Sequence, residues 1–178
     1  MSQAVGATPQ PTPRAFDDSL SHPKLAFTLP PWLTERGVDM SKYPMDTVLS
    51  QALSEHEEQF RTACRLLESM RSAGRIEAGV FLIGLLGQYS ENYGRLTRIA
   101  EALVSHPTAA TVEALASELR RVKGSSSTRG YLRCIIATLE LLPGELVDET
   151  IQELASDPRV GTRFRARLRS MTQRYYDE

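Results

Sequence analysis

The sequence predicts an all-α protein of about six to seven helices, built as stacked helical hairpins. Three observations carry this prediction. From residue 46 onward, apolar residues recur at alternating spacings of three and four, the period of one helix face. Turns rich in proline, glycine and serine separate these segments, and no segment offers itself as a partner strand. Part of the pattern also repeats within the chain, as helix pairs in a stack do. The packing alternatives are an α-solenoid-like array and an irregular orthogonal helix bundle.

Residues 1–31 are expected to form an extended or disordered N-terminal arm, followed by an all-helical domain over residues 32–178. Proline removes a backbone donor and blocks helix, and seven of the ten prolines occur by residue 44, at positions 9, 11, 13, 23, 30, 31 and 44. The arm also carries several apolar residues: Phe16, Leu20, Leu25, Phe27 and Leu29. These side chains could dock on the protein's own domain or on a partner, and the sequence leaves both possibilities open.

Composition gives no global preference for one kind of partner. The net charge is −1, 41% of the residues are hydrophobic and 24% are charged, as in ordinary globular domains. The longest uncharged apolar run, residues 78–87, has about half the length of a membrane span, and the first 30 residues show no signal-peptide pattern. We therefore expect a cytoplasmic protein without a membrane span. Cys64 and Cys134 are interpreted as buried free thiols.

The first helical pattern extends from Asp46 to Gly74. Its apolar face, at positions 49, 53, 56, 60, 63, 67 and 70, predicts one continuous helix that includes His56, with Asp46 as N-cap and Gly74 as the stop. The next run, residues 78–86, is apolar on all sides, so periodicity cannot separate a buried helix from a buried strand. Its continuation into Gln88 without a turn favours a helix, whose glycines at 79, 84 and 87 would allow close approach of a neighbouring helix.

Five further helices are predicted after this run. Their apolar positions cover residues 93–103, 112–122, 132–142, 147–154 and 160–175, and the turns between them contain Pro107, Gly124, Pro143 and Pro158. The residues expected in the core are Phe81, Leu85, Leu115, Ile135, Leu139, Leu154, Phe164 and Leu168.

The chain matches itself at an offset of 51. Residues 102–111 align with residues 153–162, with coincident leucine, serine, proline and threonine, and each stretch describes a helix, a short turn and the start of the next helix. Residues 154–168 read Leu-Ala-Ser-Asp-Pro-Arg-Val-Gly-Thr-Arg-Phe-Arg-Ala-Arg-Leu. This arrangement resembles HEAT- or armadillo-type helical repeats over about residues 75–175, although Gly161 stands where that family tends to place arginine. The resemblance implies helix pairs that bury their faces on their neighbours.

The sequence contains no recognisable pattern for catalysis, cofactor binding or metal binding. It lacks Gly-x-Ser-x-Gly, Cys-x-x-Cys and His-x-x-x-His, and its histidines, His22, His56 and His106, are isolated. Residues 123–128 (Lys-Gly-Ser-Ser-Ser-Thr) have the wrong order for a phosphate-binding loop and predict a helix–helix connection. A non-enzymatic protein is the first expectation, and an enzyme whose active site has no readable motif is an alternative.

The candidate binding site is a basic ridge on the last predicted helix. At about 100° per residue, one side of that helix collects Arg159, Arg163, Arg167 and Arg174, with Tyr175 and Tyr176 as nearby apolar anchors. The ridge predicts a protein–protein interaction or adaptor module with an acidic protein partner.

Two other interpretations of the ridge stay open. It could belong to a nucleic-acid-binding surface that also includes Arg120, Arg121, Lys123, Arg129 and Arg133. It could also be structural, with the arginine stems covering the apolar stripe and the charges paired with acids of the preceding helix, Glu145, Asp148, Glu149 and Glu153.

Overall fold

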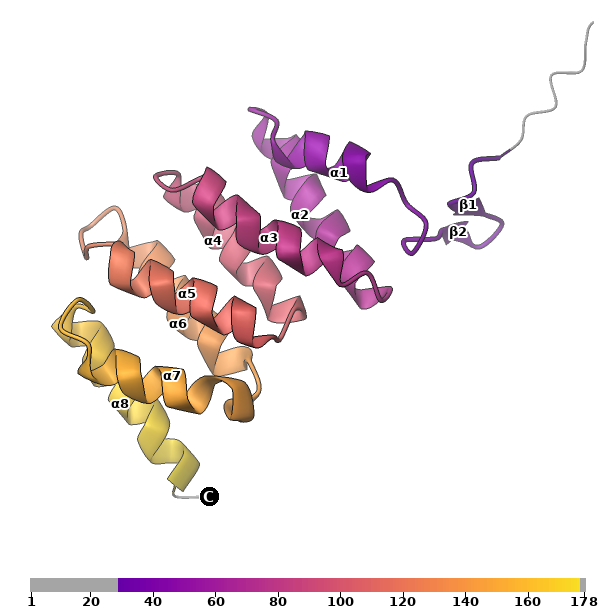
Figure 1. Ribbon diagram of the computed structural model, residues 1–178. Coiled ribbons are helices and arrows are strands. Elements are labelled where there is room, and N and C mark those ends of the chain that lie inside the picture. Colours follow the sequence, from indigo (N-terminus) through magenta and orange to yellow (C-terminus); the bar gives the residue numbers. More distant parts are fainter. Residues whose placement is uncertain (1–28, 177–178) are drawn as a thin grey trace, which may run out of the picture.

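The structure is a stack of helical hairpins, which confirms the all-α prediction (Figure 1). The computed structural model describes the backbone of residues 29–176 and the side chains of residues 29–172. The predicted N-terminal arm therefore lies almost entirely outside the described residues. Over the described part there are eight α-helices, one more than expected: α1 Met45–Ala52, α2 Glu57–Ser72, α3 Glu77–Gln88, α4 Tyr93–Ala102, α5 Ala109–Arg121, α6 Arg129–Leu141, α7 Gly144–Ser156 and α8 Thr162–Tyr176.

The helices form two layers (Figure 1). One layer holds α1, α3, α5 and α7, and the other holds α2, α4, α6 and α8. Each odd-numbered helix packs on the even-numbered helix that follows it, and within the layers α2 packs on α4, α4 on α6, and α5 on α7. A short 3-10 turn, Leu103–Ser105, extends α4. Each hairpin thus buries its apolar face on the next hairpin, which is the stacking that a repeat of helix pairs requires.

The structural period differs from the self-match in the sequence. The helices α2, α4, α6 and α8 begin at Glu57, Tyr93, Arg129 and Thr162. Successive hairpins therefore repeat at about 35 residues, which is shorter than the ~40–47 residues of HEAT and armadillo units. Of the two turns in the self-match, the first joins two hairpins and the second lies inside one, so the matched stretches are not equivalent copies of one unit. Membership of the HEAT or armadillo family stays a prediction.

The continuous first helix expected from Asp46 to Gly74 is wrong, because the chain turns between α1 and α2. Leu53 is 58% exposed and His56 is the exposed N-cap of α2, so neither lies on a buried face. The residue before α1 is Pro44, while Asp46 sits in the first turn. The predicted stop is confirmed: Gly74 has φ 92°, and the amide of the next residue donates to the carbonyl of Met70 at 3.0 Å, as in a Schellman cap.

A buried arginine from α4 explains the break between α1 and α2. The Arg95 guanidinium donates to the carbonyls of Ser54 and Glu55, each at 2.8 Å, and lies 4.6 Å from the ring centroid of Phe60. It is also 4.8 Å from the centroid of the Tyr89 ring, and only 6% of its surface is exposed. The turn is thus held by a residue about forty positions later in the chain, a contact that no local pattern reveals.

The core follows the helical pattern with two corrections. Most of the residues that the sequence placed in the core are buried: Leu85, Leu115, Ile135, Leu139, Leu154 and Leu168. Phe164 is only half-buried, and Phe81 is 36% exposed. The error at Phe81 has a simple cause, since a helix that is apolar all round gives no signal for which face is buried.

The run at residues 78–86 is a helix, as favoured, and one of its glycines is required by packing. A Cβ on Gly79 would overlap the ring of His106, which is itself buried. The glycine at 79 is therefore needed, but for the ring of His106 in the turn after α4 and not, as expected, for a neighbouring helix. The expected close approach is wrong at Gly84 and Gly87, where a Cβ would meet open space.

The described chain begins with a small β-hairpin that the sequence analysis did not anticipate. Leu33–Thr34 (β1) pairs antiparallel with Gly37–Val38 (β2), and Gly37 supplies the positive φ of the turn, 117°. Next to the hairpin, the Trp32 and Tyr43 rings pack edge to face, with 5.1 Å between their centroids. The Tyr43 carbonyl accepts a hydrogen bond from Arg75 at 2.6 Å. None of the helices in the described part of the chain has the length and hydropathy to cross a bilayer.

Candidate functional site

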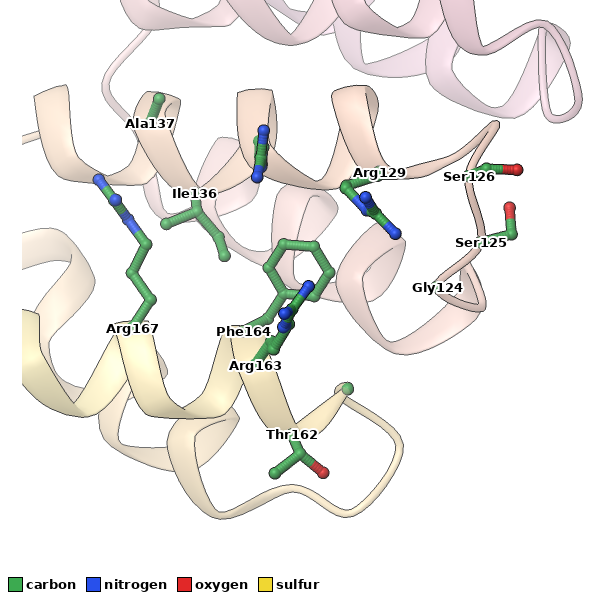
Figure 2. A pocket seen from close by; sticks show the side chains of 12 residues that line it. Gly124, Ser125, Ser126, Arg129, Ile136, Ala137, Thr162, Arg163, Phe164 and Arg167 are labelled. Carbon is green, nitrogen blue, oxygen red and sulfur yellow. The ribbon is translucent and has the colours of Figure 1, made fainter.

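A groove of about 1030 Å³ lies between α6 and α8 (Figure 2). It exists because α8 packs on α7, whereas its other side is left open toward α6. The turn that precedes α6 forms one end of the groove, and the start of α8 forms a rim. Its walls are contributed by Gly124, Ser125, Ser126, Arg129, Arg133, Ile136, Ala137, Gly161, Thr162, Arg163, Phe164 and Arg167.

Two pairs of arginines line the groove. Arg129 and Arg133 lie four residues apart on α6, and Arg163 and Arg167 lie four residues apart on α8. Residues at this spacing share one helix face, so each helix presents both of its arginines to the same side. Because α6 and α8 lie side by side with their first turns at the same end, the two faces meet and place four guanidinium groups around one hollow (Figure 2).

The partners of these arginines differ. Arg167 donates to both carboxylate oxygens of Glu140, at 2.7 and 2.8 Å. Arg129, Arg133 and Arg163 form no salt bridge with any described residue. Within the described part of the chain, three of the four guanidinium groups in the groove therefore have no carboxylate partner and can contact solvent or a bound ligand.

The positions of two of these arginines oppose helix stability. Arg129 is the first residue of α6 and Arg163 is the second residue of α8. The start of a helix carries partial positive charge, so a cation there costs about 0.3–1 kcal/mol when it has no anionic partner. An anion bound in the groove would relieve this repulsion at both helix ends at once.

The floor of the groove is apolar. Ile136 is buried beneath it, the half-buried Phe164 ring faces α6 from α8, and Ala137 is exposed on the α6 side (Figure 2). The hydroxyl groups of Ser125 and Ser126 stand at one end. The arrangement offers guanidinium donors for carboxylate or phosphate oxygens, together with a surface for apolar groups.

The ridge predicted from the sequence is only partly formed. Arg163 and Arg167 lie in the groove as expected, but Arg159 precedes α8, where its guanidinium donates to Asp157 at 3.0 and 2.7 Å. These bonds hold the pKa of the Asp157 carboxyl well below its usual range. The error arises because α8 begins at Thr162, two residues after the start of the periodic pattern at Val160, so Arg159 is not part of the helix. The remaining predicted site residues, Arg174, Tyr175 and Tyr176, have side chains outside the described residues.

The structural interpretation of the ridge applies to a different arginine. Arg163 and Arg167 make no described salt bridge with the acids of α7. Arg120 of α5 does, donating to Glu153 at 3.2 Å and to Asp157 at 3.1 Å. Arg121, also considered for nucleic-acid binding, is exposed, and its guanidinium donates to the buried Glu118 carboxylate at 2.8 and 2.6 Å.

Sequence reasoning assigned Arg129 and Arg133 only to the nucleic-acid alternative and missed that they face the ridge. The one available signal was their four-residue spacing, which matches that of Arg163 and Arg167. Their proximity depends on which helices become neighbours, and single-helix periodicity does not report this.

Both cysteines are free, as predicted, but the expected burial is confirmed only for Cys64, because Cys134 is half-buried. Burial raises the pKa of the Cys64 thiol to about 12, so that group stays protonated. Among the described residues no three His, Cys, Asp or Glu side chains gather as metal ligands would.

Comparison of the chain with protein-family models, with curated proteins and with solved structures gives no match.

Proposed function

We propose that this protein is a non-enzymatic interaction or adaptor module whose α6–α8 groove binds an acidic segment of a partner protein. One observation carries the proposal. Arg129, Arg133 and Arg163 converge from two helices on one apolar-floored groove and have no carboxylate partner among the described residues. The unfavourable placement of two of them at helix starts supports the same conclusion, because a bound anion offsets it.

Charge distribution favours an acidic protein over a nucleic acid. A polyanionic backbone needs cations along a track, whereas the whole chain has a net charge of −1. The helix beside α8 exposes Glu145, Glu149 and Glu153, which would repel a phosphate backbone that continues past the groove. A carboxylate segment needs only the groove, where guanidinium groups can form bidentate pairs.

Nucleic acid remains the second candidate, supported by the same four guanidinium groups. The cytoplasmic location expected from the sequence also remains a prediction, and the adaptor role does not depend on it.

The proposal is tested with the full chain and labelled ligands. Fluorescence anisotropy would measure binding of a glutamate-rich peptide, a scrambled neutral peptide, and random single-stranded and duplex oligonucleotides at about 50 and about 200 mM salt. The test variant is Arg133→Glu with Arg163→Glu. Its matched control is Arg36→Glu with Arg65→Glu, two exposed arginines outside the groove that receive the same change of charge.

We expect the acidic peptide to bind the native protein and the control variant, and to lose at least about tenfold in affinity with the groove variant. Tight oligonucleotide binding that falls steeply with salt and disappears in the groove variant would replace the proposal with the nucleic-acid function. Equal binding of the acidic and neutral peptides would refute it outright.

A further inference from the structure

A second hollow lies beside the basic groove, on the other side of α6. It has a volume of about 630 Å³ and occupies the space between α4 and α6. Its lining is mostly apolar and includes the most exposed large hydrophobic side chain of the described chain, Leu141, which is 69% exposed. The other lining residues are Thr97, Glu101, Val104, Gly130, Arg133, Cys134, Ala137 and Thr138.

The groove and the hollow adjoin each other across α6. Both are lined by Arg133 and Ala137, so these two residues form the crest between them. The crest is low at Ala137, because the alanine side chain is a single methyl group. An extended segment bound in the groove can cross α6 at this point without a bulky side chain in its way.

The charges on the two sides of the crest differ. The groove side has three arginines without a described carboxylate partner. The hollow side shares only Arg133 with the groove and adds one acid, Glu101, whose carboxylate is 2.8 Å from the Arg98 guanidinium. An acidic residue in the hollow would meet that carboxylate, whereas an apolar residue would meet Leu141 and Val104.

We infer that the partner segment is bipartite: a run of acidic residues occupies the α6–α8 groove, and an adjoining apolar side chain lies in the α4–α6 hollow against Leu141. The inference rests on the proposed function and deepens it by naming the partner's motif. The acidic run supplies charge pairing and on-rate, and the apolar residue supplies a desolvated anchor.

The test compares two synthetic peptides on the full chain. One carries a run of glutamates followed by glycine and serine, and the other replaces the end of that tail with leucine and phenylalanine. Both chain directions are made for each peptide. We expect the bipartite peptide to bind about tenfold more tightly in one direction, because one large apolar side chain leaves water.

Two variants locate the gain. Leu141→Gln should abolish the advantage of the bipartite peptide and leave the affinity for the glutamate-only peptide unchanged. Ile76→Gln is the matched control, since Ile76 is 66% exposed at the start of α3 and outside both hollows. Because both side chains are largely exposed in the free protein, neither substitution removes core packing.

Cys134 gives an independent readout, because its half-buried thiol lines the hollow, whereas Cys64 is buried elsewhere. The bipartite peptide should slow alkylation of Cys134 at saturation, and the glutamate-only peptide should not. If both peptides bind equally, or if Leu141→Gln keeps the gain, the bipartite motif is wrong and the proposed function stands. If the glutamate-only peptide fails to bind, the proposed function itself fails.

Discussion

The two ends of the helical stack use arginine in opposite ways. Near the N-terminal end, Arg95 lies in the first turn of α4 and is almost fully buried, with two loop carbonyls and two aromatic rings around its guanidinium. Near the C-terminal end, Arg163 lies in the first turn of α8, is exposed, and has no salt bridge with the described chain.

This difference separates structure from binding. Arg95 joins α4 to the turn before α2 and so ties two hairpins together. Among the groove arginines, only Arg167 links two helices through a described ion pair, by its bond from α8 to Glu140 on α6. Removing Arg95 should therefore damage the fold, and removing the groove arginines should damage only recognition.

The largest effect is expected from Arg95→Ala. The change leaves the Ser54 and Glu55 carbonyls without their donors and removes the cation from between the Phe60 and Tyr89 rings. The free energy of unfolding, measured by urea denaturation, should fall by about 3 kcal/mol. Arg36→Ala, at an exposed turn position, should change it by less than about 0.5 kcal/mol. Similar small losses for both variants would show that Arg95 does not hold the turn.

A matched pair of glycines tests the packing between hairpins. Gly79→Ala places a methyl group into the ring of buried His106 and should destabilise the protein by about 1–3 kcal/mol. Gly84→Ala, on the same helix but facing open space, should stabilise it by about 0.5–1 kcal/mol. Thermal unfolding distinguishes the two signs. A stable Gly79→Ala variant would mean that α3 lies further from His106 than described.

Stability should also depend on the protonation of His106. Its ring nitrogen Nδ1 accepts a hydrogen bond from Arg71 at 2.9 Å, and burial together with the nearby Arg71 charge lowers the pKa of the ring below its usual range. A lowered pKa means that the unfolded chain binds the proton more readily. The contribution of the neutral ring is complete above about pH 6.5 and is lost as the pH falls below that value.

Urea unfolding between about pH 7.5 and pH 5.5 measures this loss. It should be smaller in His106→Gln, whereas His56→Gln, at an exposed position, should follow the native protein. Parallel curves for the native protein and His106→Gln would contradict the assignment.

The smallest effect concerns Glu140, which competes with the ligand for Arg167. Neutralising it by Glu140→Gln frees a fourth guanidinium for the groove, and affinity for the glutamate-rich peptide should rise about threefold. Glu58→Gln, an exposed acid on α2, should leave the affinity unchanged. An unchanged affinity for Glu140→Gln would place the acidic run away from Arg167.

The sequence predicted the parts of this molecule that depend on local spacing. The helical class, the stop at Gly74 and most core positions follow from the three–four pattern and from turn chemistry. The break before α2 could not be predicted, because Arg95, which holds it, is distant in sequence. The exposure of Phe81 escaped prediction because α3 is apolar all round.

The candidate site divides in the same way. Arg163 and Arg167 were predicted from their place on one helix face, whereas Arg129 and Arg133 join them only through the packing of α6 beside the α7–α8 hairpin. The pairing of neighbours in a stack depends on its true period. The self-match did not reveal that period, because its two turns occupy different places in the hairpins.

The most direct test of the account is a paired measurement of stability and binding in Arg133→Gln with Arg163→Gln. If the groove arginines serve recognition, the double variant should lose at least about tenfold in affinity for the glutamate-rich peptide. Its free energy of unfolding should stay unchanged or rise by about 0.5 kcal/mol, because a cation is removed from the start of α8. A fall in stability of more than about 1 kcal/mol with unchanged peptide affinity would contradict the account and make these arginines structural, as Arg95 is.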